Sequence, residues 1–266
     1  MAEDRIGNTI NWDHPAACKA RIIDPDRGLI DWNGRTKLAI VGFASSSKDK
    51  APYEDPEWVV WGLNQLYRHI NRADAWIDIH HDYAAEAKVV EGTDFMGWLT
   101  QAPIPIFMCK READIPSSVR YPLEEITAKY GARYFTSTIS YMIAYGIYAG
   151  FREIGLWGVD LIVGKEYFHQ KPCAEFWLGM ANAMGIQVRL ADESALLKST
   201  HLYGFEDGPV HGPIKIGEIE ERLAKMDKRK EELIRELQTV DGAQQDCRYW
   251  LELAALRLRG GAIPAL

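Results

Sequence analysis

The chain has little of what would make it disulfide-bonded, membrane-spanning or strongly cationic. Its four cysteines are scattered without CxxC spacing, which argues against a zinc site and a disulfide framework and predicts reduced thiols. No apolar run approaches the ~18 residues that span a bilayer, and the first residues lack a basic region followed by an apolar one. We therefore expect a soluble, cytoplasmic protein with no membrane partner.

Two nucleotide-binding signatures are missing as well. The sequence contains neither GxGxxG nor GxxxxGK[ST], so neither a dinucleotide fingerprint nor a P-loop is predicted. Positive charge is also in deficit, because the formal net charge is -7. A large nucleic-acid interface needs many Lys and Arg residues, so a nucleic-acid partner is disfavoured. The net charge does not exclude a local basic groove.

Apolar residues, by contrast, are abundant at 47% of the chain, with 26% charged, which is globular composition. A length of 266 residues suits one main domain with an appendage. Strand-like runs alternate with helical segments; the strands are expected at 37–43, 58–63, 73–81, 104–109, 154–159 and 186–190. This alternation predicts a doubly wound, mostly parallel, Rossmann-like α/β sheet over residues 36–205, preceded by an irregular arm at residues 1–35.

Residues 212–266 differ from the rest of the chain in their apolar spacing and their charge balance. Apolar side chains follow a three-four spacing, with Lys230 at the one position where another is expected; they are Ile219, Leu223, Met226, Leu233, Leu237 and Val240. Ten Lys and Arg balance ten Asp and Glu between residues 211 and 266, so the net charge lies in residues 1–210. We expect residues 241–243 to break the helix and give a helical hairpin. It would either join copies into a homo-oligomer or pack on its own domain.

The stretch from Phe135 to Asp160 organises the predicted domain. Ser137 and Thr138 stand before an apolar helix, which is the usual signal of a helix start, and Asp160 follows a buried strand. Ligands of open α/β sheets bind at the carboxyl ends of strands, so these hydroxyls and this acid can face one crevice. The alternative is that they only cap the helix and the next loop.

Two further strand ends carry candidate binding residues. The first strand runs into a small-residue turn with Gly42, Ser45, Ser46 and Ser47, where amide hydrogens and hydroxyls can approach phosphates. Asn64 ends the second strand, and its carboxamide can bind a base or ribose or stabilise its own turn.

The third strand ends in Asp78, His80, His81 and Asp82, which are residue types that bind metals. Alternate strand residues point to opposite faces, and no second ligand group is evident elsewhere in the chain. We therefore predict no metal site.

Several motifs between residues 36 and 200 occur in an order seen elsewhere. Thr136-Ser137-Thr138, Tyr141-Met142, the segment 150–154 and Gly158-Val159-Asp160 carry most of it, with support from segments 41–46, 63–67 and 193–197. The set resembles the sialyltransferases of bacterial lipooligosaccharide synthesis (glycosyltransferase family 42). It also resembles uncharacterised proteins of tailed phages and prophages, which would place the protein in the host cytoplasm if it is phage-encoded.

The resemblance implies a CMP- or UDP-linked nucleotide sugar as co-substrate, with no cofactor and no metal. It implies that the nucleotide lies near the turn of Gly42, Ser45, Ser46 and Ser47 and near Asn64. Ser137 and Thr138 would then lie near phosphate or sugar, and Asp160 would form the floor.

The family's lid supplies phosphate-binding tyrosines and a catalytic histidine, and it is far longer than residues 161–170 of this chain. Tyr167 and His169 are the local candidates, and they match by type and not by spacing. A histidine can remove the proton of an acceptor hydroxyl, while a tyrosine hydroxyl can stabilise the departing phosphate. The alternative for His169 is an ordinary histidine of a surface loop.

These observations favour a glycosyltransferase-like enzyme that moves a sugar from a nucleotide sugar to a hydroxyl acceptor. A non-catalytic nucleotide-binding phage protein is the first rival, favoured by the missing lid. The second is a phage transferase that modifies DNA bases, which the acidic charge disfavours.

Overall fold

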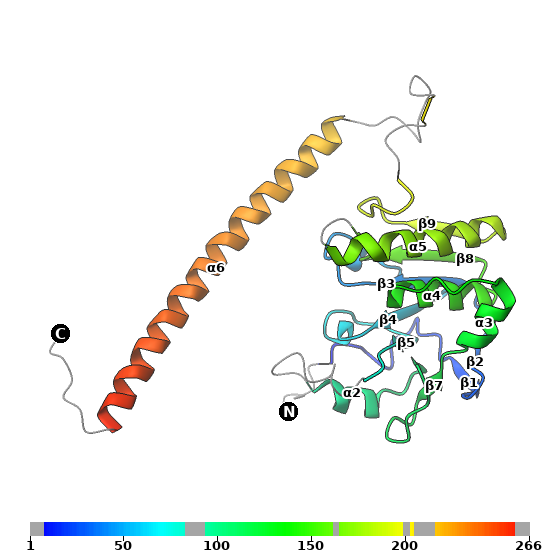
Figure 1. Cartoon of the computed structure of the whole chain (residues 1–266), viewed down its shortest axis with the longest axis horizontal. Helices are drawn as coiled ribbons and strands as arrows, with labels where there is room; N and C mark the ends of the chain where they lie inside the picture. Colours follow the sequence, from blue (N-terminus) through cyan, green and yellow to red (C-terminus); the bar gives the residue numbers. More distant parts are fainter. Residues whose placement is uncertain (1–7, 83–93, 162–164, 199–202, 205–215, 259–266) are drawn as a thin grey trace. The chain divides into compact units, whose positions relative to one another are not determined.

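A computed structural model describes residues 8–82, 94–161, 165–198, 203–204 and 216–258. The chain divides into two compact units, residues 1–198 and residues 199–266 (Figure 1). The first unit holds the sheet and the shorter helices, and the second contains one long helix. No helix in the described part of the chain is both long and apolar enough to cross a membrane.

Seven parallel strands form the main sheet in the order β7-β6-β5-β4-β3-β8-β9. They are β3 (Lys37–Val41), β4 (Trp58–Leu63), β5 (Ala75–Asp78), β6 (Ile106–Met108), β7 (Ser118–Arg120), β8 (Glu153–Trp157) and β9 (Gln187–Leu190). The chain winds outward from β3 to β7 and then returns to add β8 and β9 on the other side of β3. The winding direction therefore reverses between β3 and β8, and the predicted doubly wound, Rossmann-like α/β class is confirmed.

The centre of the sheet is buried because its strands are mostly apolar, whereas the edge strand β9 is partly exposed. Every residue of β4 and β8 is buried, as expected for parallel strands covered on both faces. Large aromatic rings fill much of the core, and Trp61, Trp76, Trp98 and Trp177 are almost fully enclosed. The Trp61 ring lies 5.4 Å from that of Tyr145 on the covering helix, which ties β4 to that helix.

Short helices connect the strands. They are η1 (Lys48–Lys50), η2 (Leu66–Arg68), α2 (Phe95–Gln101), α3 (Leu123–Tyr130), α4 (Thr138–Tyr148) and α5 (Lys165–Ala183). Helices α3, α4 and α5 lie side by side along the sheet (Figure 1). Ser137 caps α4 by accepting a hydrogen bond from the Ser140 amide, as predicted for a hydroxyl ahead of an apolar run. The start of α4 therefore lies at the carboxyl ends of the strands, because α4 runs opposite to the strand that follows it.

Three segments differ from the sequence-based expectations. The amino-terminal arm contains a two-stranded antiparallel sheet, β1 (Arg21–Asp24) and β2 (Leu29–Asp31), where an irregular arm was expected. The polar stretch before residue 122 contributes the edge strand β7. Helix α5 begins at Lys165 and contains Pro172, so Tyr167 and His169 lie on a helix and not on the expected loop. A proline usually marks a helix start, but this helix continues through it.

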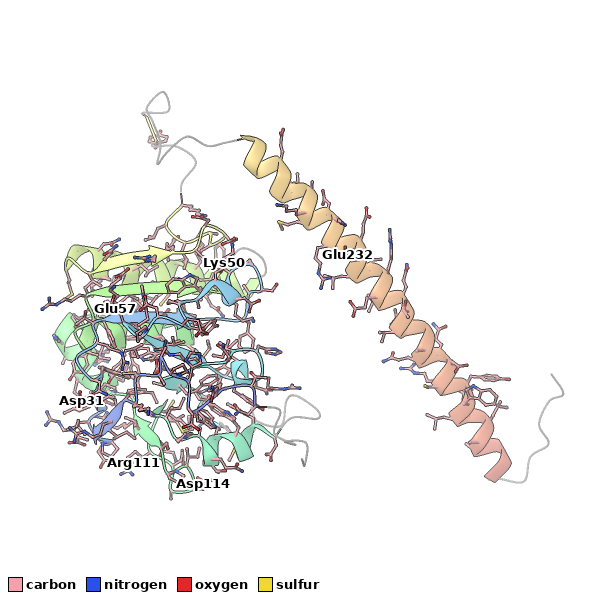
Figure 2. All side chains as sticks on the ribbon, turned by 180° about the vertical axis from the view of Figure 1, so that it is seen from behind. Asp31, Lys50, Glu57, Arg111, Asp114 and Glu232 are labelled. Atoms are coloured by element: carbon pink, nitrogen blue, oxygen red, sulfur yellow. The ribbon has the colours of Figure 1, made fainter. Side chains whose placement is uncertain are left out.

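The predicted helical hairpin is wrong. Helix α6 (Ile216–Leu258) is continuous over 43 residues, and Figure 2 shows side chains projecting along it, with Glu232 labelled. The reason is that the apolar three-four spacing resumes beyond residue 241 at Cys247, Leu251, Ala254 and Leu258, with Gln244 as the one polar residue at a stripe position. Gly242 falls outside this stripe, and a glycine there costs only about 1 kcal/mol, which is too little to end a helix.

Candidate functional site

A cleft of about 380 Å³ opens at the carboxyl ends of β4 and β5. Its described lining comes from four parts of the chain, namely the ends of β4 and β5, the start of α4 and the first turns of α5. The lining residues are Leu63, Asn64, Ile79, His80, Thr136, Ser137, Thr138, Ile139, Tyr141 and Gln170. Three residues predicted from the sequence, Asn64, Ser137 and Thr138, therefore lie together in one cleft.

Asn64 turns the chain where β4 ends. Its φ angle is 49°, in the left-handed region that asparagine tolerates better than most residues, and its carbonyl accepts a hydrogen bond from Trp76 Nε1 at 3.0 Å. The side-chain Oδ1 atom is buried and has no hydrogen-bond partner in the described part of the protein. A buried acceptor of this kind requires a donor, which a bound molecule can supply.

Hydroxyl groups surround the start of α4. Ser137 Oγ lies 3.1 Å from Ser140 Oγ, and Thr136 Oγ1 donates a hydrogen bond to the His169 carbonyl at 2.8 Å. The first amides of a helix carry partial positive charge, which favours an anion at this end. The cleft therefore combines hydroxyl donors with a site suited to a phosphate.

Asp78 and His80 form a pair at the end of β5. Asp78 is completely buried, and its Oδ1 atom contacts His80 Nδ1, while the His80 side chain is 27% exposed where it lines the cleft. The sequence analysis missed this pair, because it weighed the cluster only as a metal site. His81 and Asp82 are exposed, and no group of three metal-ligating side chains occurs among the described residues.

Two weakly acidic groups belong to the surroundings of this pair. Burial raises the pKa of the Tyr141 phenol, and nearby Cys109 and Cys173 raise it further. Burial also raises the pKa of the Cys109 thiol, and the charge of Asp78 adds to this effect. Both groups are therefore neutral near pH 7, and the Tyr141 phenol stays protonated. Tyr141 lines the cleft and was not predicted as a site residue.

The remaining predicted binding residues gather at the reversal between β3 and β8. Ser46 Oγ donates to Asp160 Oδ2 at 2.6 Å, and the buried Ser47 Oγ accepts from the Gly158 amide at 2.8 Å. A Cβ atom on Gly42 would lie 2.4 Å from the Gly158 carbonyl oxygen, so glycine permits this close approach. These residues bind one another, and none of them lines the cleft within the described residues.

Three details complete the predicted set. Ser45 is exposed. His169 is exposed on α5 and is not among the described lining residues; its carbonyl accepts a hydrogen bond from Thr136, which lines the cleft. The side chain of Tyr167 lies outside the described residues.

Other clefts have similar volumes, so volume alone does not select the site. One of about 410 Å³ is lined by residues that include Thr9, Asp49, Arg68 and His69. The cleft at β4 and β5 differs in its chemistry, because a buried carboxylate–imidazole pair, an unpartnered amide oxygen and a helix start meet there at the carboxyl edge of the sheet.

Fold and cleft together define a Rossmann-like α/β protein with a polar site at the carboxyl edge of its sheet. No protein-family model matches the chain, and neither does any curated protein sequence. Solved structures do match. The Campylobacter jejuni sialyltransferase CstII in complex with the substrate analogue CMP-3FNeuAc is 17% identical, with 58% of this chain and 80% of that chain covered and a TM-score of 0.40.

The monofunctional α-2,3-sialyltransferase Cst-I from Campylobacter jejuni is 15% identical, with 77% of this chain and 99% of that chain covered and a TM-score of 0.40. An α-2,3-sialyltransferase from Campylobacter jejuni in apo form is 14% identical, with 65% and 81% covered and a TM-score of 0.40.

Proposed function

We propose that this protein is a glycosyltransferase-like enzyme that transfers a sugar from a CMP- or UDP-linked donor to a hydroxyl acceptor. The observation that carries the proposal is the convergence of Asn64, His80 and Ser137 in one cleft at the carboxyl edge of the sheet. Asn64 can bind the nucleobase, His80 can transfer a proton, and the start of α4 at Ser137 can bind the phosphate.

Each part of the cleft suits one part of such a donor. Asn64 Oδ1 has no partner among the described residues, and it can accept a hydrogen bond from the exocyclic amine of cytosine or the ring N–H of uracil. The start of α4, with the hydroxyls of Ser137 and Thr138, suits the phosphate that carries the sugar. Charge that develops on this phosphate as it departs would be stabilised by the same donors.

The resemblance seen in the sequence names a histidine base, with His169 as the local candidate and Tyr167 as the partner that steadies the phosphate. Asp160 would form the floor of the nucleotide site, where it accepts a hydrogen bond from Ser46. Ser45 and Gly42 complete the turn beside it. We keep these roles as the alternative to catalysis by the residues that line the cleft, and substitution of each residue distinguishes the two.

Thermal unfolding in the presence of nucleotides tests the binding step. We expect cytidine or uridine compounds to raise the Tm, whereas AMP and GMP leave it unchanged; a ligand at 100 times its Kd stabilises by about 2.7 kcal/mol. No shift with any nucleotide or nucleotide sugar would reject the proposal. Binding without release of free sugar from any donor would instead assign the non-catalytic alternative.

We also propose that α6 pairs with α6 of a second copy of this chain. Leu223, Met226 and Leu237 of its apolar stripe are more than half exposed, and the charges around them balance. A helix of this length extends about 65 Å, and an isolated helix is marginally stable without packing. A polar residue such as Lys230 within the stripe is a feature that restricts pairing to one register.

Truncation after His211 tests the pairing. We expect the full chain to have at least twice the mass of one copy by light scattering, and the truncated chain to be monomeric. Equal numbers of copies in both would assign the apolar stripe to packing within one chain.

A further inference from the structure

The Asp78–His80 pair has the features of a proton-transfer device, and the proposed sugar transfer needs one. Resting on that proposed function, we propose that His80 Nε2 is the base that removes the acceptor's proton, with Asp78 holding the ring in place. His80 would take the role that the sequence resemblance gives to His169.

Position is the first argument. His80 lines the cleft together with Asn64 and Ser137, and its side chain is mostly buried but still accessible. His169 is exposed on α5 and is not among the described lining residues. A base must come within hydrogen-bond reach of the acceptor hydroxyl, so a histidine inside the cleft is better placed than one outside it.

The contact with Asp78 is the second argument. Asp78 Oδ1 contacts His80 Nδ1, and among the described residues Asp78 has no other ion pair. A carboxylate at Nδ1 holds the neutral ring in the tautomer with its proton on that nitrogen, so Nε2 carries the lone pair that accepts a proton. Which nitrogen carries the proton thus follows from the carboxylate's position.

Burial of Asp78 favours proton transfer to His80. The carboxylate is completely enclosed at the end of β5, and its second oxygen, Oδ2, has no hydrogen-bond partner in the described structure. A buried charge is costly unless an opposite charge accompanies it. When His80 gains the acceptor's proton, the pair becomes an ion pair, so Asp78 stabilises the state that the reaction creates.

The neighbouring groups do not compete for this role. Burial raises the pKa of Tyr141, and burial together with Asp78 raises the pKa of Cys109, so both stay protonated near pH 7. Neither can serve as the base at that pH. His80 is therefore the group of this cluster suited to accept a proton.

The step balances as follows. The acceptor oxygen forms a bond to the anomeric carbon while its proton passes to His80 Nε2. The bond between the anomeric carbon and the phosphate oxygen breaks, and its electron pair leaves with the nucleotide, whose phosphate faces the start of α4. The imidazolium afterwards returns its proton to water.

Donor hydrolysis provides an assay that needs no knowledge of the natural acceptor, because water takes the acceptor's place. We expect His80→Ala to lower kcat for nucleotide release from the best CMP- or UDP-linked sugar by about 100-fold or more. KM for the donor should change less than about threefold, and added imidazole should restore part of the rate. The matched control is the exposed His81, which is outside the described lining of the cleft, and His81→Ala should keep kcat within about threefold. His169→Ala tests the alternative base.

Asp78 is a positioning residue, so its test must separate orientation from folding. We expect Asp78→Asn to lower kcat by about 10-fold or more, and the double variant Asp78→Asn/His80→Ala to be no slower than His80→Ala alone. A purely structural role would add a second loss. If Asp78→Asn does not fold, Asp78→Glu takes its place in the same comparison, because it keeps the carboxylate but changes its position relative to His80 Nδ1.

Nucleotide-induced Tm shifts, measured on the same variants, keep the two proposals apart. Hydrolysis that survives in His80→Ala but is lost in His169→Ala overturns the role of His80 and leaves the proposed function standing. A wild-type chain that binds no nucleotide overturns the proposed function, and the role of His80 falls with it.

Discussion

At the reversal between β3 and β8 the carboxyl edge of the sheet is closed by the protein's own hydrogen bonds, whereas at β4 and β5 it opens into a cleft. The closed part consists of Gly42, Ser46, Ser47, Gly158 and Asp160, which contact one another. Doubly wound sheets commonly bind ligands at such a reversal, yet here its small residues serve close packing. Strand order alone therefore does not locate the site, because the side chains at each strand end decide whether the edge is open.

The open part consists of Asn64, Asp78, His80 and Ser137. Two of its acceptors, Asn64 Oδ1 and Asp78 Oδ2, are buried without a hydrogen-bond partner in the described structure. In the closed part Asp160 Oδ1 is likewise buried without a partner in the described structure, while Asp160 Oδ2 accepts a hydrogen bond from Ser46. The two parts differ in access, because Asn64, His80 and Ser137 line the cleft and no described residue of the closed part does. We therefore expect substitutions in the closed part to change stability and those in the open part to change binding.

The largest effect is expected for Gly158→Ala in the closed part. A Cβ atom there would lie 2.4 Å from the Gly42 carbonyl oxygen, and Gly158 has a φ of 66°, so steric overlap adds to backbone strain. We expect a loss of about 3 kcal/mol or more in the free energy of unfolding, measured by urea denaturation. Gly150→Ala is the control, because its φ is 85° and its Cβ would meet open space. It should lose only about 1 kcal/mol, and equal losses would show that packing at Gly158 does not matter.

Ser46→Ala should have the next largest effect. It removes the hydrogen bond to Asp160 Oδ2, and hydrogen bonds to charged groups contribute about 1.5–3 kcal/mol. We expect a loss of this size in urea denaturation, with nucleotide-induced Tm shifts retained. Ser45→Ala is the matched control, because Ser45 is exposed in the same turn. A stable Ser46→Ala chain that no longer binds nucleotide would instead place the ligand in the closed part.

Asn64→Gly should lower nucleotide affinity and leave stability nearly unchanged, which is the opposite of the result expected for Ser46→Ala. Glycine adopts the left-handed backbone of Asn64 without strain, and the removed Oδ1 atom has no partner in the described structure, so stability should change by less than about 1 kcal/mol. Nucleotide affinity should fall by about 10-fold, which corresponds to the loss of one hydrogen bond and is measured by calorimetry. The exposed Asn182→Ala serves as the control. Unchanged affinity would remove Asn64 from the site.

The smallest effect on either part is expected from removal of residues 212–266. Both parts belong to the unit that ends at Lys198, so its unfolding free energy and its nucleotide affinity should be unchanged within error. The mass in solution is the property that should fall. A weaker nucleotide affinity in the truncated chain would mean that the site depends on the second unit or on a second copy.

The central strands of the main sheet could be predicted from sequence because they are largely apolar runs. β4, at Trp58–Leu63, matches the expected segment end to end. β7, at Ser118–Arg120, could not be predicted, because it is a three-residue edge strand within a polar stretch. The start of α5 was missed because Pro172 normally marks a helix boundary. The hairpin was expected because Gly242 was weighed alone, without following the apolar stripe beyond it.

The site could be predicted only in part. Asn64, Ser137 and Thr138 were found from their places at a strand end and a helix start, and the structure brings them together. His80 was missed as a proton-transfer residue, although residues two apart on a strand share a face and the pairing with Asp78 follows from that period. Tyr141 belongs to the Tyr141-Met142 motif of the resemblance, but that motif assigned it no role in the site. Which strand end stays open depends on contacts between distant residues, such as Ser46 with Asp160, and no local pattern contains these.

The hydrogen bond from Trp76 Nε1 to the Asn64 carbonyl gives the molecule an optical consequence. An indole in direct contact with the residue that begins the cleft reports on that residue's surroundings, because indole emission responds to the field and hydrogen bonding at Nε1. Movement of Asn64 toward a ligand should therefore alter the intrinsic fluorescence. Trp76→Phe would identify this component among the nine tryptophans, so that ligand binding to the unlabelled protein can be followed by its own light emission.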